Sequence, residues 1–484
     1  MDFERSKKIL FQLTIVYFVS VLIVFLIAAD SFSRERINGD TLSPVAVVCE
    51  QTDGVVLEQK LSLPAEYVDS VYIQAGTFGR ENSGEIIVEM LDAEGNFLGE
   101  ARGKAAAFGD GSYTYLQFAE PILGKRGESV NLRIVSQGSI PGNAIALYYG
   151  NSVRTGRFDI VLNVPEKERY LLNGEIGAGR LCIYLSGVNE LMVSRFYWPM
   201  MLILYIVIAG CCRIWWKQAK EGRNNPLVMF CTLATRYSFL MRQLIGRDFK
   251  TKYKRSVLGI GWSFLNPLLT MTVQYIVFST LFSNGTKNYP VYLLSGIVLF
   301  NFFNEAVSLG MGSIVGNASL IKKVYVPKYI YPVSRVFSSL INLGTSMIPL
   351  LAVMVLTGTV LKPSLLLLVF DLCCLVMFVV GMVLILSTSM TFFQDTQFLW
   401  GVASMAWMYL TPIFYTESII PEKLLFLYHM NPMYQYITFA RICIIEGVSP
   451  GPTAYLWCII SALAVFVFGV FVFKKNQDKF VLNL

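Results

Sequence analysis

Residues 237–253 are the part of the chain whose residue types are best suited to binding a charged ligand. Apolar side chains recur every four residues along this segment, at Met241, Ile245, Phe249 and Tyr253. Basic side chains lie toward another helical face, at Arg242, Arg247, Lys250 and Lys254. The pattern predicts an amphipathic helix at the inner surface of a membrane. Its cations would contact anionic lipid, or would in addition guide an anionic head group inward.

Motifs for catalysis or nucleotide binding are not found in the sequence. No G-x-x-x-x-G-K-[ST] loop occurs, so the chain does not bind ATP by that route. His429 is the only histidine, which excludes a credible Ser/His/Asp triad, and the nine cysteines contain no C-x-x-C pair that suggests zinc. We therefore expect no catalytic residue, no metal and no cofactor on this chain. If the chain works in active transport, another chain must supply the energy.

Ionisable residues inside the later apolar segments are few, and they are functional suspects by default. They are Glu305, Arg335, Asp371, Asp395 and Arg441. Because they form no regular acidic or histidine relay, a proton-coupled transporter is not indicated.

The composition is that of a membrane protein. Hydrophobic residues make up 54% of the 484 residues and charged residues only 15%, and the mean hydropathy is +0.54. Soluble domains rarely reach this balance, whereas apolar runs of about 20 residues can cross a bilayer. Eight such spans are expected, near residues 9–29, 196–212, 258–283, 289–312, 331–358, 364–390, 396–414 and 452–473.

The first apolar stretch favours a retained span over a cleaved signal peptide, because it is longer than a typical signal core. Small residues at Ala28 and Ala29 leave cleavage open. Residues 213–257 contain eleven Lys or Arg against two acids, which places this segment in the cytoplasm. Both termini are then cytoplasmic. Since the basic residues flank spans and form no soluble patch, membrane lipids are expected partners and nucleic acid is not.

Residues 30–195 are more polar and contain short β-rich segments separated by Gly, Asn, Asp or Pro. The spacing predicts an extracytoplasmic all-β sandwich of jelly-roll type. Four tyrosines of this region are candidate surfaces for stacking of sugar rings: Tyr113, Tyr115, Tyr148 and Tyr149. The alternative is that they pack in the core, as aromatic residues in alternating strands more often do. Cys49 and Cys182 fall in this region and could form a disulfide, although two cysteines define no framework.

Two irregular segments interrupt the later spans. Residues 317–332 form a short Lys- and Tyr-rich cytoplasmic connection, which could transmit motion from a partner or simply be a well-anchored turn. Residues 411–451 are too apolar for a free loop and are broken by prolines. Two short re-entrant helices, 423–430 and 433–445, would line or close an external exit, since irregular backbone at membrane depth must be buried in protein or face water. A membrane-surface hairpin is the alternative.

From about residue 230 onward the chain resembles the permeases of ABC-2 type transporters. It looks most like the branch that exports O-antigen, teichoic acid and related surface polysaccharides. The resemblance lies in a set of stretches that occur in the family's order and spacing: Arg247–Gly259, Gly261–Leu268, Leu320–Pro327, Tyr409–Tyr415, Ile420–Pro421 and Asn431–Met433. It covers a little over half of the chain.

The apolar segments and the β-rich region together predict an α-helical polytopic membrane protein with an inserted all-β jelly-roll-like domain. The expected organisation is a first span (1–29), the β domain (30–195), a second span (196–216), a cytoplasmic linker with an amphipathic helix (217–257) and a membrane core (258–484). The resemblance implies that this core has six spans and an external gate segment (415–451), and that the amphipathic helix is an interface helix. It also implies a homodimer in a bacterial cytoplasmic membrane, two copies of a separate ATPase that holds ATP and magnesium, and a glycan on undecaprenyl diphosphate as cargo.

The resemblance also implies roles for individual residues. The head group would be admitted by Arg247, Lys250, Lys252, Lys254 and Arg255. The ATPase would be coupled through Asp248, Phe249, Leu320, Lys322, Lys323 and Tyr325. The channel or external gate would use Trp262, Phe302, Phe303, Trp407, Tyr415 and Pro421. Ordinary packing or lipid contact is the alternative for each of these aromatic residues.

The chain departs from the family at its N-terminus, which adds a pair of spans and a large external domain. Residues 76–89 resemble jelly-roll, carbohydrate-binding-like modules, so Arg80 joins Tyr113, Tyr115 and Tyr148 as a glycan-binding candidate. The departure leaves the cargo open, and export of a lipid, drug or peptide is an alternative. A membrane glycosyltransferase would need a carboxylate pair on the first external loop, where Asp30 is alone. A glycan sensor would need a cytoplasmic output domain, which is not found.

Overall fold

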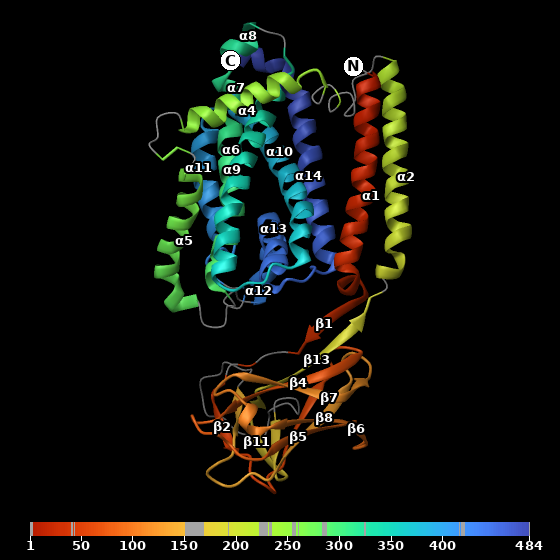
Figure 1. The fold of residues 1–484 in the computed structure, drawn as a ribbon, viewed down its shortest axis with the longest axis vertical. Coiled ribbons are helices and arrows are strands. Elements are labelled where there is room, and N and C mark those ends of the chain that lie inside the picture. Colours follow the sequence, from red (N-terminus) through yellow and green to blue (C-terminus); the bar gives the residue numbers. More distant parts are fainter. Residues whose placement is uncertain are drawn as a thin grey trace. The chain divides into compact units, whose positions relative to one another are not determined.

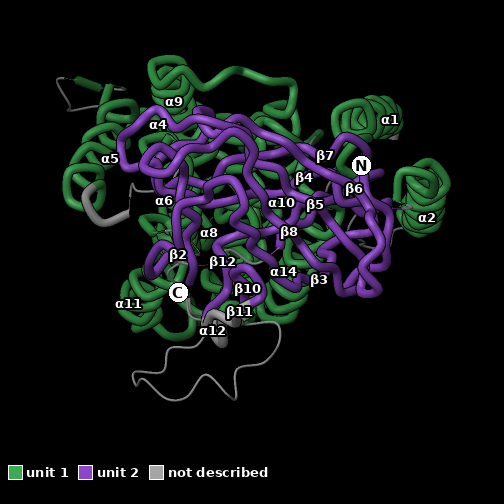
Figure 2. Tube along the Cα trace, turned by 90° about the horizontal axis from the view of Figure 1, so that it is seen from below, with its two compact units in different colours: residues 1–32, 193–484 green, residues 33–192 purple. Residues whose placement is uncertain are grey.

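The computed structural model describes most of the chain in two compact units. The described residues are 3–39, 42, 44–150, 169–191, 193–221, 231, 235–253, 258–259, 261–282, 288–323, 326–415, 417 and 422–483. One unit, which is helical, comprises residues 1–32 and 193–484, and the other, which is built of strands, comprises residues 33–192 (Figures 1 and 2). The expected bounds of the β domain were 30–195.

The long helices of the helical unit are α1 (Phe3–Ser33), α2 (Val193–Lys220), α4 (Ser238–Tyr253), α5 (Gly261–Phe282), α6 (Tyr289–Met311), α9 (Ile330–Leu356), α10 (Leu368–Phe392), α11 (Thr396–Tyr409) and α14 (Pro452–Asn476). The short ones are α7 (Ser313–Gly316), α8 (Ala318–Lys323), α12 (Glu422–His429), α13 (Pro432–Arg441) and α15 (Phe480–Asn483). The polytopic helical fold is therefore as predicted.

Six helical segments among the described residues are long and apolar enough to cross a membrane: α1, α2, α6, α9, α10 with its preceding turn, and α14. The other two expected spans are also helices. However, α11 has only 14 residues, fewer than the roughly 20 that a full crossing requires. Helix α5 has 22 residues, which is long enough for a crossing, and it contains Asn266, Pro267 and Gln274.

Helix α6 is the most buried of these six helices and packs against α5, α9 and α10 (Figure 1). Its side chains are buried on nearly every side, as expected for a helix that is apolar all round. Helices α10 and α14 approach each other closely through Gly381 and Gly469: a Cβ on Gly469 would meet the carbonyl oxygen of Gly381 at 2.4 Å. Small residues allow this close backbone contact, which is how helices pack in membranes.

Helices α1 and α2 form an antiparallel pair. The Tyr17 hydroxyl donates to the carbonyl of Met201 over 2.8 Å, and the Tyr197 hydroxyl donates to that of Val21 over 2.8 Å. Near the end of α1, Phe32 contacts Tyr455 of α14, with ring centroids 5.3 Å apart. Most other apolar side chains of the pair are exposed, which suits contact with lipid.

The second unit is an antiparallel β domain, as predicted. Its strands are β1 (Arg34–Asn38), β2 (Ala46–Glu50), β3 (Leu57–Ser62), β4 (Tyr67–Gly76), β5 (Glu85–Leu91), β6 (Phe97–Lys104), β7 (Tyr113–Leu123), β8 (Ser129–Gln137), β9 (Ala146–Gly150), β10 (Arg169–Leu172), β11 (Glu175–Ala178), β12 (Arg180–Leu181) and β13 (Ile183–Glu190). They pair in the order β1-β13-β4-β7-β6-β5-β8-β3-β10-β11, and β9 joins β4 to β2 and β12.

Two groups of strands enclose the β-domain core. Strands β6 and β7 are paired only at Ala101 and Phe118, so the order of strands divides between them. One group is β1-β13-β4-β7 and the other is β6-β5-β8-β3-β10-β11. Both groups contribute buried apolar residues to one cluster, and burial alternates strictly along β8 as the pleat requires. Cys49 and Cys182 are both free thiols, so the disulfide considered from the sequence is not formed.

Candidate functional site

Helix α4 is joined to helix α9 by a largely buried carboxylate. The Asp248 side chain is only 7% exposed, and its two oxygens lie 3.1 Å from Arg335 Nη1 of α9 and 3.0 Å from Arg247 Nη2 of α4. Because a buried carboxylate is costly without partners, the two guanidinium charges stabilise it: Arg247 donates hydrogen bonds to Oδ1, and Arg335 forms an ion pair with Oδ2. This ion pair is the first of two polar connections between α4 and the membrane helices.

The second connection joins α4 to α6 and α9. Lys252 Nζ of α4 lies 2.9 Å from Glu305 Oε1 of α6, and Asn342 Nδ2 of α9 donates to the same oxygen over 2.6 Å. Asp248 and Lys252 are four residues apart and therefore lie on one face of the helix. That face of α4 is therefore connected by charged contacts to both α6 and α9.

Apolar contacts complete the seating of α4. Met241 and Leu244 are buried, and they belong to one apolar cluster with Ile330 and Tyr331 at the start of α9. Helix α4 is thus attached to the membrane helices by buried apolar side chains at Met241 and Leu244 and by the ion pair of Asp248. The opposite face remains exposed, as the amphipathic pattern predicts.

A buried arginine fastens α13 at the broken segment. Arg441 Nη1 donates to the carbonyl of Pro412 over 2.7 Å, and Nη2 donates to those of Tyr292 and Ile413 over 3.1 and 3.0 Å. Its guanidinium also lies over the Tyr292 ring, 3.4 Å from the centroid. These carbonyls belong to α6 and to the turn after α11, so Arg441 ties α6, α13 and that turn together in the segment expected to form the external gate.

Amide and indole groups hold the same turn from the other side. Trp407 Nε1 donates to Asn431 Oδ1 over 2.8 Å, and Asn431 Nδ2 donates to Thr411 Oγ1 over 2.9 Å. The Tyr289 hydroxyl donates to the carbonyl of Phe414 over 2.7 Å. The two prolines of Thr411–Pro412 and Asn431–Pro432 thus sit in a cross-linked structure, in which irregular backbone finds its partners within the protein.

Residues 240–445, which contain both of these structures, match the family described as "ABC-2 type transporter". This region is an ABC-2 type transporter domain. The β unit lies outside it.

Curated relatives are similar to about half of the chain. An O-antigen export system permease protein RfbA of Klebsiella pneumoniae is 28% identical over 248 residues, which are 50% of this chain and 93% of the relative. A protein of the same name from Myxococcus xanthus is 24% identical, over 51% of this chain and 96% of the relative. A capsule polysaccharide export inner-membrane protein CtrC of Neisseria meningitidis is 23% identical, over 38% of this chain and 72% of the relative.

The predicted head-group residues of the ABC-2 domain that the structure describes differ in whether an acidic partner outside α4 holds them. Arg247 and Lys250 are exposed on α4, and Lys250 makes no ion pair within the described residues. Lys252 is bound to Glu305. Lys254 and Arg255 lie outside the described residues.

The predicted coupling residues of the ABC-2 domain lie on α4 and α8. On α8, Leu320, Lys322 and Lys323 are exposed around the buried Ile321. On α4, Phe249 is half-buried, and Asp248 has the structural role described above. Tyr325 lies outside the described residues.

The predicted channel and gate aromatics of the ABC-2 domain occupy different environments. Phe302 and Phe303 are buried in the core, and the Phe303 ring packs against Trp407 with centroids 5.2 Å apart. Trp262 is 45% exposed on α5, and the half-buried Tyr415 donates its hydroxyl to the carbonyl of Tyr409 over 2.7 Å. Pro421 lies outside the described residues. Sequence reasoning noted Arg441 only as ionisable and missed its role, because its carbonyl partners are distant in sequence.

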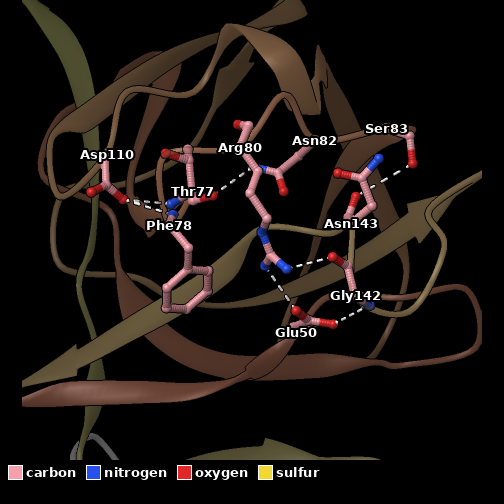
Figure 3. A network of polar contacts seen from close by, with 9 residues as sticks. All are labelled: Glu50, Thr77, Phe78, Arg80, Asn82, Ser83, Asp110, Gly142 and Asn143. Carbon is pink, nitrogen blue, oxygen red and sulfur yellow. Dashed lines mark hydrogen bonds and ion pairs between the residues drawn. The ribbon is translucent and has the colours of Figure 1, made fainter.

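In the β unit, Arg80 belongs to a polar network (Figure 3). Its Nη2 lies 2.9 Å from Glu50 Oε1, and its Nη1 donates to the carbonyl of Gly142. The Gly142 N–H donates to Glu50 Oε2 over 2.7 Å. This backbone hydrogen bond, followed by the Arg80 side chain, lowers the pKa of Glu50, so the carboxylate is ionised at neutral pH.

The predicted tyrosines of the β unit are partly used in packing. The Tyr113 hydroxyl donates to the carbonyl of Leu42 over 3.1 Å. Tyr115 is 46% exposed, and its ring meets that of Tyr72 edge-on. Tyr148 is half-buried beside Gly76, where a Cβ would meet its hydroxyl at 3.3 Å.

Proposed function

We propose that the chain is the permease subunit of an exporter that moves a lipid-linked cell-surface polysaccharide from the cytoplasmic to the outer face of a bacterial membrane. The observation that supports this most directly is the ABC-2 domain, with its charge-fastened helix α4, in a chain similar to O-antigen and capsule export permeases. The cargo is a glycan on undecaprenyl diphosphate, and a separate ATPase supplies the energy.

In this proposal α4 and α8 receive the force. Two permease chains form a homodimer, and two ATPase subunits bearing ATP and magnesium dock on the exposed residues Leu320, Lys322 and Lys323 of α8. Movement of the ATPases displaces α4, and its ion pairs to Arg335 and Glu305 carry the displacement into α9 and α6. Because α6 and α9 move as rigid helices with α4, their displacement opens the transport pathway across the membrane.

The exposed cations of α4 attract the diphosphate. Arg247 and Lys250 are exposed, so they can form charge-assisted contacts with phosphate oxygens without breaking the Lys252–Glu305 pair. The termini are cytoplasmic, and the β domain is extracytoplasmic, where it meets the emerging glycan.

Reconstitution tests the proposal. Proteoliposomes that contain the chain, the ATPase encoded with it and a labelled undecaprenyl-diphosphate glycan should translocate the label when ATP and magnesium are added. Liposomes that lack either protein should not. Translocation by the chain alone, or normal surface polysaccharide in cells that lack the chain, would refute the proposal.

The same cells separate glycan export from the alternatives. Loss of the chain should cause lipid-linked glycan to accumulate on the cytoplasmic side, because synthesis continues while export stops. Loss of a lipid, drug or peptide from the medium with an unchanged surface glycan would identify a different cargo.

A further inference from the structure

The turn that follows β4 holds a phenylalanine in an unfavourable backbone conformation. Phe78 has φ 55° and Gly79 has φ 69°, and the Arg80 N–H donates to the carbonyl of Thr77 over 3.1 Å. Two successive positive φ angles are characteristic of a type I′ turn, which favours Asn-Gly. A bulky side chain at the first of these positions is a steric outlier. Asparagine would fold this turn more readily than phenylalanine.

Burial of the ring does not offset this strain. The Phe78 side chain is 52% exposed, and it is not part of the apolar cluster that forms the β-domain core. The turn is instead held by Asp110, whose Oδ1 accepts from the N–H groups of Thr77 over 2.7 Å and of Phe78 over 3.1 Å (Figure 3). The fold therefore holds the strained backbone of an exposed aromatic residue in place, a combination that points to function.

The groups beside the ring are polar and carry no excess positive charge, because Arg80 is accompanied by the two carboxylates Glu50 and Asp110. The Arg80 guanidinium carbon lies 5.1 Å from the centroid of the Phe78 ring. Its positive charge is balanced by Glu50, and both side chains are about one third exposed, at 35% and 33%. An accessible ion pair offers hydrogen-bond donors and acceptors side by side, without the excess positive charge that a phosphate group would require.

This combination fits a sugar ring. One face of a pyranose presents C–H groups that pack on an aromatic ring, and its hydroxyls both donate and accept hydrogen bonds. We propose that the Phe78 turn, with Arg80 and Glu50, is a binding site for a neutral sugar unit of the exported polysaccharide. The identity of that ligand rests on the proposed function. The site itself rests on the strained, exposed ring and its neutral ion pair.

A substitution that separates strain from binding tests the site. The full chain, purified in detergent, is titrated with polysaccharide released from its lipid and taken from the surface of the cells that make this protein. Phe78→Asn should weaken binding about tenfold, while the melting temperature of the β domain stays the same or rises. Phe78→Tyr should retain binding, because it keeps a ring. Phe97→Asn is the matched control, since Phe97 is also exposed, at 59%, in the same domain.

Three results would overturn the inference. The first is wild-type chain that does not bind the polysaccharide, and the second is equal binding by wild type and Phe78→Asn. The third is a chain that binds phosphatidylglycerol vesicles and not the polysaccharide, with vesicle binding lost in Phe78→Asn. That result would make the ring a membrane anchor. The proposed function fails separately. If polysaccharide export persists in cells that lack the chain, the export proposal is wrong whatever Phe78→Asn does to binding.

Discussion

The ion pair between Asp248 and Arg335 should determine how firmly α4 is attached to the membrane helices. Two unit charges 3.1 Å apart attract by about 5 kcal/mol at an effective dielectric constant of ~20. The desolvation of Asp248, which is 7% exposed, offsets part of this, and the 25% exposure of Arg335 screens another part. We therefore expect a coupling free energy of about 2 kcal/mol, which corresponds to a factor of ~30 in an equilibrium constant.

A double-mutant cycle measures this coupling. Amide hydrogen exchange reports the local opening of α4 in the wild type, in Asp248→Asn, in Arg335→Gln and in the double mutant. Each single substitution should speed exchange of the α4 amides about 30-fold, and the double mutant should not be much faster than either. Lys250→Gln is the control, since Lys250 is exposed on the same helix, and it should change exchange less than about twofold. Multiplicative effects in the double mutant would show that the pair carries no coupling, and they would refute the role of α4 as a helix fastened to α9 by charge.

Three further predictions concern the gate and the β domain. Gly296→Ala should destabilise the helical unit by about 1–3 kcal/mol, seen as a lower melting temperature, because its Cβ would meet Arg441 Nη2 at 2.8 Å. Gly344→Ala should not lower the melting temperature, because a Cβ on Gly344 would meet open space. Equal destabilisation by the two substitutions would contradict this interpretation. The pKa of Glu50 is lower in the folded than in the unfolded protein, so its carboxylate stabilises the β domain. This stabilisation is complete above the unfolded-state pKa of about 4.3, and it is lost as the pH falls through the lower folded-state pKa. Glu50→Gln should flatten this acid limb in pH-dependent melts, and an unchanged limb would argue against the network. Burial raises the pKa of the Cys182 thiol to about 11, so maleimide should label it far more slowly in the native state than in urea. Reductant should not shift the melting temperature, since a shift would reveal a disulfide.

Local features of the fold follow closely from the sequence. The amphipathic pattern at 237–253 became α4, residues 238–253, and the two helices expected in the broken segment became α12 and α13. Asp92–Asn96, a stretch of turn-forming residues, is the turn that joins β5 to β6, and the Asp92 carboxylate accepts from the N–H of Asn96 over 2.8 Å. These elements are set by spacing, prolines and turn residues within a few positions of one another, so a single sequence contains the information.

The site could not be predicted in the same way, because its contacts join residues far apart in the chain. Asp248 was expected to serve coupling, but nothing in its surroundings in sequence indicates Arg335 as its partner. Lys252 was grouped with cations free to bind a head group, whereas Glu305 occupies it. Phe78 was overlooked because only the backbone angle makes it unusual. Helix length was also misjudged: α11 is apolar but ends at Tyr409, before the prolines that follow.

The two ends of the β domain lie side by side. The Leu191 N–H donates to the carbonyl of Ser33 over 2.7 Å, and β1 pairs with β13 from Arg34 opposite Glu190 to Asn38 opposite Ser186. A module whose ends meet can be inserted into the connection between two adjacent helices at little cost in loop closure. The domain therefore meets the requirement for a single module placed between α1 and α2, because its first and last strands pair with each other.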